Sequence, residues 1–170
     1  MSVQSMTNTP TTDVEATLGQ IEALVRAGCD IVRVSVPDDQ ASRAFGELKK
    51  RSIVPLVADI HFDHRLAVSA IQQGADGVRI NPGNIGGAEG LRDVALAAKE
   101  RGIPIRVGVN LGSVRRSMLR RHGDDPVGAI VESAAMYVGM LEDMGVTAMK
   151  VSLKSSDVLQ TIDAYRRFSR

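Results

Sequence analysis

The feature that most constrains this chain is a regular alternation of short apolar runs, rich in Val and Ile, with longer segments of helical period. This alternation is typical of successive βα units whose strands form a parallel sheet. Strands are expected at Val3–Met6, Ile31–Val36, Pro55–Ile60, Gly77–Ile80, Pro104–Val109 and Ala148–Leu153. Helices are expected at about 14–25, 39–50, 64–73, 88–101, 127–144 and 156–168, with an additional short, basic helix over 113–121.

Glycines mark the expected ends of four helices. Gly28, Gly74, Gly102 and Gly145 each follow a helical segment and precede a strand. A glycine in this place suits the left-handed conformation that commonly terminates a helix. With 170 residues and 44% hydrophobic content, the chain can bury a sizeable core, and it contains no low-complexity linker. We therefore expect one domain, or a piece of one, over residues 1–170.

Six βα units fit either an open doubly wound sheet or part of a (β/α)₈ barrel. The first helix does not begin with a Gly-rich phosphate loop, and the strands repeat one internal pattern, which favours the barrel. A full barrel has eight strands and typically about 250 residues. The expected fold class is therefore α/β, a TIM-type barrel truncated to about six βα units.

Composition excludes several classes of partner. Lys and Arg number 21 and Asp and Glu number 20, so bulk charge does not indicate nucleic-acid or membrane-surface binding. The basic segment 115–121 lacks aromatic neighbours and is most simply a solvated helix face. Cys29 is the single cysteine and is expected to be a small buried side chain. Without an apolar span or a secretory leader pattern, the expectation is a soluble cytoplasmic protein.

Polar residues recur at alternate positions at the ends of the expected strands. Because side chains alternate faces along a strand, residues two apart point the same way, while the Val and Ile residues between them point to the other face. In a barrel the apolar face packs against helices, and the polar set points inward near the carboxyl ends, where active sites lie. The set comprises Arg33 and Ser35; Asp59 and His61; Arg79 and Asn81; Arg106, Gly108 and Asn110; and Lys150, Ser152 and Lys154.

Four cations in this set would repel one another at a small barrel mouth unless an anion lies among them. Asp59 alone does not neutralise Arg33, Arg79, Arg106 and Lys150. The planar fork of arginine suits phosphate oxygens, and asparagine amides can bind neutral oxygens. The pattern therefore predicts a phosphate or diphosphate ester as ligand. The alternative is that each cation pairs with a carboxylate or extends to solvent at its strand end.

Two further motifs allow more than one interpretation. His61 can be an acid/base group, a donor to phosphate, or a structural histidine held by Asp59 or Asp63. No third ligand accompanies Asp59 and His61 at a suitable spacing, so no metal site is expected. The segment 84–87 can present backbone N–H groups to an anion or form a plain βα turn.

Seven motifs give the chain a resemblance to a known family. They are VQSMTNT at 3–9, TTDVEAT at 11–17, DIVRVSVP at 30–37, PLVADIHFD at 55–63, RINPGNIG at 79–86, IPIRVGVN at 103–110 and KVSLKSSDV at 150–158. In this order and over essentially the whole chain, they resemble the 4-hydroxy-3-methylbut-2-en-1-yl diphosphate synthases, iron–sulfur oxidoreductases of non-mevalonate isoprenoid biosynthesis.

The resemblance implies a TIM-type barrel that binds methylerythritol cyclodiphosphate, joined to a smaller domain that holds a [4Fe-4S] cluster. It implies ferredoxin or flavodoxin as electron donor and a homodimer in which the barrel of one subunit meets the cluster domain of the other. By this resemblance, Arg33, Arg79, Arg106 and Lys150 hold the diphosphate, and the remaining substrate-binding residues are Asn81, Asn110, Asp59, His61 and Ser152.

The chain also departs from the family pattern. The last two barrel strands and the cluster domain are not recognisable in it, and Cys29 does not replace several thiolate ligands. The isolated chain is therefore expected to carry most of the substrate-binding half without catalysing reduction, and we assign no catalytic residue to it. An open six-stranded barrel exposes two strand edges, so self-association or low stability is expected.

Two other functions remain as alternatives. A pterin-binding barrel of the dihydropteroate synthase type also places Asp, Asn, Arg and Lys at strand ends. The chain can instead be a non-catalytic anion-binding or oligomerising fragment. The long motifs favour the synthase family over the pterin-binding barrel.

Overall fold

The computed structural model describes all 170 residues as six strands and seven α-helices in alternation. The strands are β1 (Gln4–Met6), β2 (Ile31–Ser35), β3 (Leu56–Ile60), β4 (Gly77–Ile80), β5 (Ile105–Asn110) and β6 (Met149–Lys154). The helices are α1 (Val14–Arg26), α2 (Asp39–Arg51), α3 (His64–Gln72), α4 (Gly87–Arg101), α5 (Arg116–His122), α6 (Pro126–Asp143) and α7 (Val158–Phe168), with a 3₁₀ turn η1 at Leu111–Ser113.

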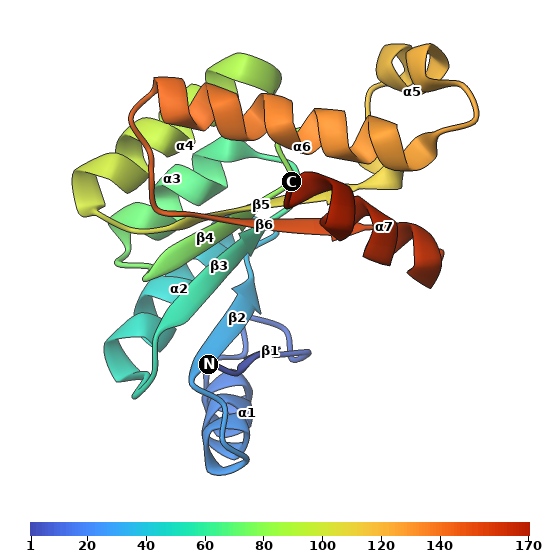
Figure 1. Cartoon of the computed structure of the whole chain (residues 1–170). Helices are drawn as coiled ribbons and strands as arrows, with labels where there is room; N and C mark the ends of the chain where they lie inside the picture. Colours follow the sequence, from blue (N-terminus) through green and yellow to red (C-terminus); the bar gives the residue numbers. More distant parts are fainter.

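The strands form one parallel sheet in the order in which they occur in the chain, from β1 to β6. Figure 1 shows this sheet curling from α1 at one end to α6 and α7 at the other, with the helices along its outer side. Sequential parallel strands with helical crossovers are the TIM-barrel arrangement, and six strands are present here. The expected fold class is confirmed.

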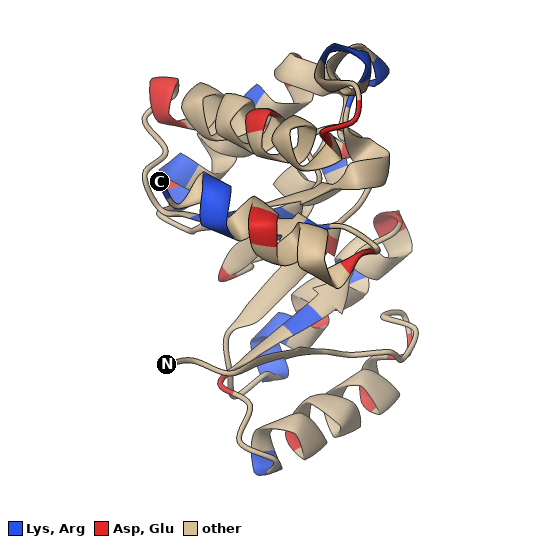
Figure 2. Ribbon diagram, turned by 45° about the vertical axis from the view of Figure 1, so that its right-hand side comes forward, with Lys and Arg blue, Asp and Glu red and all other residues tan.

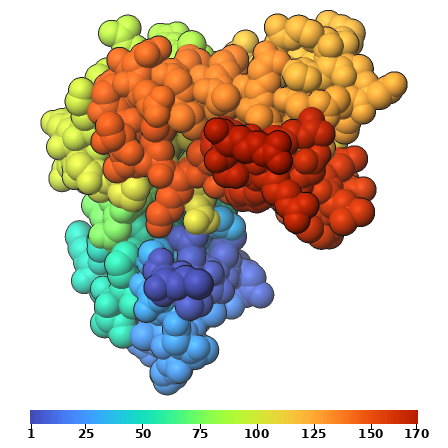
Figure 3. Space-filling model, in the orientation of Figure 1, coloured from blue at the N-terminus to red at the C-terminus, as the bar shows by residue number.

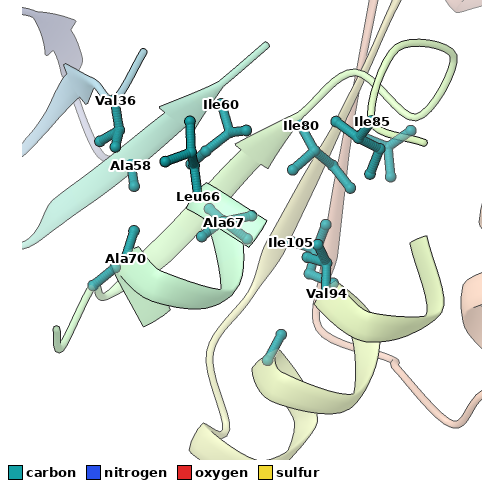
Figure 4. Close-up of a cluster of buried hydrophobic side chains, with 14 of the residues drawn as sticks. Val36, Ala58, Ile60, Leu66, Ala67, Ala70, Ile80, Ile85, Val94 and Ile105 are labelled. Carbon is teal, nitrogen blue, oxygen red and sulfur yellow. The ribbon is translucent and has the colours of Figure 1, made fainter. Parts of the chain in front are cut away.

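The core lies between the outer face of the sheet and the helices. Val32, Val34, Ala58 and Ile80 are fully buried, and they alternate along their strands with the polar residues of the other face. Figure 4 shows strand residues such as Ile60 and Ile105 packed against side chains of α3 and α4. This burial holds the helices on one face and leaves the polar face of each strand directed into the curl.

The helix ends follow the chemistry expected from the sequence. Asp13, Asp38, Asp63, Asp125 and Asp157 precede five helices, and each accepts a backbone N–H of the first turn through its carboxylate. The glycines predicted to end helices, at positions 28, 74, 102 and 145, all have positive φ angles, between 66° and 97°. The predicted helix terminations are confirmed.

The differences from the sequence expectation are local. Pro55 and Pro104, expected to open strands, lie just outside β3 and β5, although each carbonyl accepts a hydrogen bond from the neighbouring strand. The expected basic helix over 113–121 is divided, because Val114 and Arg115 are extended between η1 and α5. No helix has both the length and the apolar character needed to cross a membrane.

Candidate functional site

Four of the residues predicted to line the barrel mouth lie in one row across the sheet. Asp59 on β3 is paired in register with Arg79 on β4, Arg79 with Arg106 on β5, and Arg106 with Lys150 on β6. Because residues in one register row of a sheet share a face, their side chains enter the same interior. The structure therefore brings three of the four predicted cations and the predicted carboxylate together.

Asp59 is the carboxylate at the centre of this arrangement. Only 3% of it is exposed, and its Oδ1 lies 3.2 Å from Nη1 of Arg79, while its Oδ2 lies 3.3 Å from Nε of Arg33. The ring nitrogen Nε2 of His61 lies 3.4 Å from Oδ1. One buried carboxylate thus pairs with two guanidinium groups and contacts the histidine, which confirms part of the alternative in which cations pair with carboxylates.

Arg33 differs from the other cations in its register. It is paired with Val57, two residues before Asp59, so its Cα does not lie in the row that the other three share. Its side chain still reaches Asp59, and Sδ of Met6 lies 3.3 Å from Nη2 and 3.4 Å from Nε. Burial lowers the pKa of Arg33; the charges of Arg79 and Arg106 lower it further, and Asp59 opposes this shift.

Arg106 is held from the opposite side of the curl. Its Nη1 donates a hydrogen bond of 2.8 Å to Oε1 of Gln4, which joins β5 to β1 across the interior. Gln4, Arg106 and Lys150 line a small cavity of about 70 Å³. Lys150 is exposed on the edge strand and has no ion pair. The structure thus leaves Arg106 and Lys150 without a carboxylate partner.

Gly108 makes room for Arg79. A Cβ at position 108 would lie 2.7 Å from Nε and 2.8 Å from Nη2 of Arg79, closer than real contacts allow. Gly108 lies two residues after Arg106, so both positions are on the same face of β5. Because Gly108 has no side chain, it leaves space on that face. The guanidinium of Arg79 occupies that place, with 14% of its side chain exposed.

The predicted asparagines lie farther toward the carboxyl ends of their strands. Asn81 is 4% exposed, and its Oδ1 accepts the N–H of Gly83. Asn110 ends β5, and both asparagines line a cavity of about 200 Å³ together with Arg79 and His61. Ser152 lies on β6 in register with Gly108 and is half-buried. The cavity brings together these two predicted amide groups, a guanidinium and an imidazole.

Four residues that contact this interior were not identified as site residues from the sequence. Gln4 and Met6 hold arginines from β1, where their alternate spacing matches the pattern found on the other strands. Phe62, with 74% of its surface exposed, and Asn84 complete the lining of the 200 Å³ cavity. The same periodicity rule, applied to β1, identifies Gln4 and Met6. Phe62 and Asn84 lie outside the strands, and for Asn84 the sequence suggests only the backbone contacts of segment 84–87.

The residues of the chain do not fit a metal or an iron–sulfur cluster. No group of three or more His, Cys, Asp or Glu side chains is placed to hold a metal ion. Cys29 is buried, and its Sγ lies 3.0 Å from the carbonyl oxygen of Ile31. A [4Fe-4S] cluster requires several thiolate ligands, so Cys29 alone does not hold one.

Geometry and charge together define the class of protein. It is a parallel βα sheet of the TIM-barrel type whose interior carries three arginines, a lysine and one buried carboxylate. Arg106 and Lys150, expected near the carboxyl ends, are the second residues of β5 and β6 and lie in the amino-terminal half of these strands. Comparison with sequence families is consistent with this class. The GcpE TIM-barrel domain matches residues 1–170, and the chain belongs to that family.

Several curated relatives share one name. Two of them are 4-hydroxy-3-methylbut-2-en-1-yl diphosphate synthase (flavodoxin) from Thermodesulfovibrio yellowstonii, 52% identical over 98% of this chain, and the same-named protein from Pseudomonas putida F1, 51% identical over 100% of it. The aligned region covers 48% and 46% of those proteins. The chain therefore spans about half the length of the curated relatives it matches.

Solved structures give the fold alone. A dihydropteroate synthase from Clostridium difficile, crystallised in the presence of pteroic acid, has a TM-score of 0.69 over 98% of this chain and 70% of its own, at 15% identity. An N-succinyl Arg/Lys racemase from Bacillus cereus has a TM-score of 0.60 over 89% of this chain and 37% of its own, at 19% identity. These similarities support the barrel fold and do not favour the pterin-binding alternative.

Proposed function

We propose that this chain is the substrate-binding barrel of a 4-hydroxy-3-methylbut-2-en-1-yl diphosphate synthase and binds 2-C-methyl-D-erythritol 2,4-cyclodiphosphate. The single observation that carries the proposal is the register row of Arg79, Arg106 and Lys150 beside one buried carboxylate. A cyclic diphosphate brings the negative charges that this interior lacks. The names of relatives more than 50% identical to this chain support the choice of that diphosphate.

Each polar residue has a role in this proposal. Arg106 and Lys150, which lack carboxylate partners, bind phosphoryl oxygens directly, and Arg79 and Arg33 bind them while Asp59 fixes their guanidinium planes. Asn81, Asn110 and Ser152 donate hydrogen bonds to neutral or bridging oxygens. His61, half-exposed at the edge of the cavity, contacts the ligand as a donor. These groups bind and orient the substrate, and we assign no proton-transfer step to them.

The reduction itself requires a group that these residues do not supply. The conversion removes one oxygen as water and consumes two electrons and two protons. We propose that a [4Fe-4S] cluster, held by cysteines other than Cys29, supplies the electrons, and that flavodoxin, which the relatives' names give, is the donor to it. On its own, the 170-residue chain binds the cyclodiphosphate and does not reduce it.

A ligand panel tests the proposal. The chain is titrated calorimetrically with the cyclodiphosphate, inorganic diphosphate and pteroic acid, after circular dichroism has established that the sample is folded. We expect the cyclodiphosphate to bind most tightly and diphosphate more weakly, because only the former fills the cavity beside Asn81 and Asn110. Binding of pteroic acid without binding of either diphosphate would support the pterin-binding function instead.

A further inference from the structure

We propose that helix α5 is the docking surface for an acidic electron-carrier protein of the flavodoxin type. The inference rests on the proposed function, and it adds the place on this chain where the carrier binds. The helix lies outside the row of βα units, and Figures 1 and 3 show it projecting from the upper right of the molecule.

The charge of this helix is concentrated and unneutralised. Arg115, Arg116 and Arg120 are exposed, and none of them has an ion-pair partner. Arg116 and Arg120 are four residues apart and therefore share one side of the helix. Figure 2 shows α5 as a largely blue segment at the edge of the molecule. The whole chain has a net charge of only +1, so this positive charge is a local feature.

The remaining residues of α5 fix its position. Met118 is buried against the core, and Glu132 on α6 accepts a hydrogen bond from Arg121 and pairs with His122. One side of the helix is thus attached to α6, while the three unpaired arginines are directed to solvent. A helix anchored in this way presents its charges in a fixed arrangement, which lowers the entropic cost of docking.

The helix also adjoins the mouth of the barrel. Leu119 lines a cavity of about 550 Å³ with Asn110 and Lys154, at the carboxyl ends of β5 and β6. Asn110 lines this cavity and also the 200 Å³ cavity that contains Arg79. A protein bound to α5 therefore lies beside the opening through which the proposed substrate enters. A carrier docked on α5 is thus close to the place where the proposed substrate is reduced.

The chemistry of the patch favours an acidic protein over nucleic acid. Exposed arginines attract carboxylates and accelerate association through long-range electrostatics. A site for single-stranded nucleic acid combines positive charge with aromatic side chains on which bases stack, and segment 115–122 contains none. Small phosphates bind where several donors converge, whereas these three arginines are exposed on a helix that projects from the molecule (Figure 1). The partner that fits best is a protein with a cluster of surface carboxylates.

The test measures binding of flavodoxin to the complete 170-residue chain at low and high salt. We expect binding at low salt that weakens as salt rises, because exposed charges are screened. Replacing Arg115, Arg116 and Arg120 by glutamate is expected to weaken binding by at least about tenfold. The matched control replaces Arg43, Arg92 and Arg101, which are also exposed and unpaired, by glutamate, and is expected to leave the affinity unchanged.

Three outcomes would overturn the docking site. They are no binding of flavodoxin by the unmodified chain at low salt, equal losses in the two triple variants, and tighter binding of a duplex DNA than of flavodoxin. Cyclodiphosphate binding, measured on the same samples, separates this inference from the proposed function. If both triple variants bind the cyclodiphosphate as the unmodified chain does, loss of flavodoxin binding belongs to α5 and not to a failure to fold.

Discussion

Asp59 is the buried carboxylate that pairs with two of the interior arginines. With 3% of Asp59 exposed, removal of its charge leaves Arg33 and Arg79 facing each other without a counter-ion. We expect Asp59→Asn to lower the free energy of unfolding by about 3 kcal/mol, the range found when one partner of a buried pair is removed. Urea unfolding followed by circular dichroism measures this loss.

The same variant reports on anion binding. Inorganic diphosphate can replace the missing negative charge, so it is expected to stabilise Asp59→Asn more than the unmodified chain. Asp124→Asn is the control, because Asp124 is exposed and takes part in no ion pair. Equal stabilisation of the two chains by diphosphate would show that Asp59 does not share its site with an anion.

Gly108 gives a second prediction for a single residue. Gly108→Ala is expected to displace the guanidinium of Arg79 and to weaken cyclodiphosphate binding by about tenfold, with little change in secondary structure. Calorimetric titration measures the affinity. Gly139→Ala, on α6, is the control, since a Cβ there meets nothing within 4 Å. An unchanged affinity in Gly108→Ala would show that the position of Arg79 does not matter for binding.

Individual site residues were predictable to the extent that strand periodicity determines their direction. The spacing of Arg79 and Asn81, or of Arg106 and Asn110, predicts one shared face. The structure places Arg79, Asn81 and Asn110 around one cavity, whereas Arg106 lines a separate cavity with Lys150. The partners of each cation were not predictable, because they depend on distances between strands. The hydrogen bond between Arg106 and Gln4 joins residues 102 positions apart, and nothing local in the sequence indicates it.

At the scale of single elements, helix α3 gives a pH-dependent prediction. Hydrogen bonds from the side chain and backbone of Arg65 lower the pKa of Asp63 from 3.8 to about 2. Because the pKa of Asp63 is lower in the folded chain, its charged carboxylate stabilises the fold at pH values above the ordinary pKa of 3.8. This contribution is lost as the pH falls through about 2. Asp63→Asn retains a good N-cap residue but removes the charge.

We therefore expect Asp63→Asn to be less stable than the unmodified chain by about 1 kcal/mol at neutral pH, since solvent screens a pair this exposed. The difference should shrink as the pH is lowered from 5 toward 2, measured by urea unfolding at each pH. Asp143→Asn, at an exposed position without an ion pair, should show no such trend. A difference that stays constant with pH would contradict the role of the Asp63 charge.

Elements were predicted well where local chemistry determines them. The predicted helix ends at Gly28 and Gly102 are correct because the backbone has a positive φ angle at both positions, and glycine adopts that conformation without strain. The register of β2 is not predictable from the sequence. Periodicity makes the four cations equivalent, whereas Arg33 is paired with Val57 and lies outside the row that the other three share. A periodicity of two residues shows which face of the sheet a side chain lies on. It does not show which residue of the neighbouring strand is paired with it, because that register depends on how the strands pack.

At the scale of the whole molecule, both ends of the sheet are open. β1 and β6 each have one neighbour, and Figure 3 shows an open notch between α7 and the N-terminal region. Val158 and Leu159 on α7 are among the exposed large apolar side chains. Unpaired strand edges beside an apolar helix face favour association with another chain.

We expect the 170-residue chain to self-associate, and Leu159→Glu to shift it toward monomer, because a charge on that face opposes apolar contact. Sedimentation velocity at several protein concentrations measures the distribution. Leu96→Glu, which changes an exposed leucine on α4, is the control and should leave the distribution unchanged. A well-behaved monomer at all concentrations would contradict this prediction.

Calorimetric titration of the chain with the cyclodiphosphate is the decisive test of the proposed diphosphate site among the interior cations. We predict measurable binding that Arg79→Ala and Arg106→Ala each weaken by at least about tenfold, as expected for the loss of a charged contact. Arg43→Ala, at an exposed site on α2, should leave the affinity unchanged. A folded chain that gives no binding heat, or binding that both interior variants retain in full, would rule out the proposed diphosphate site.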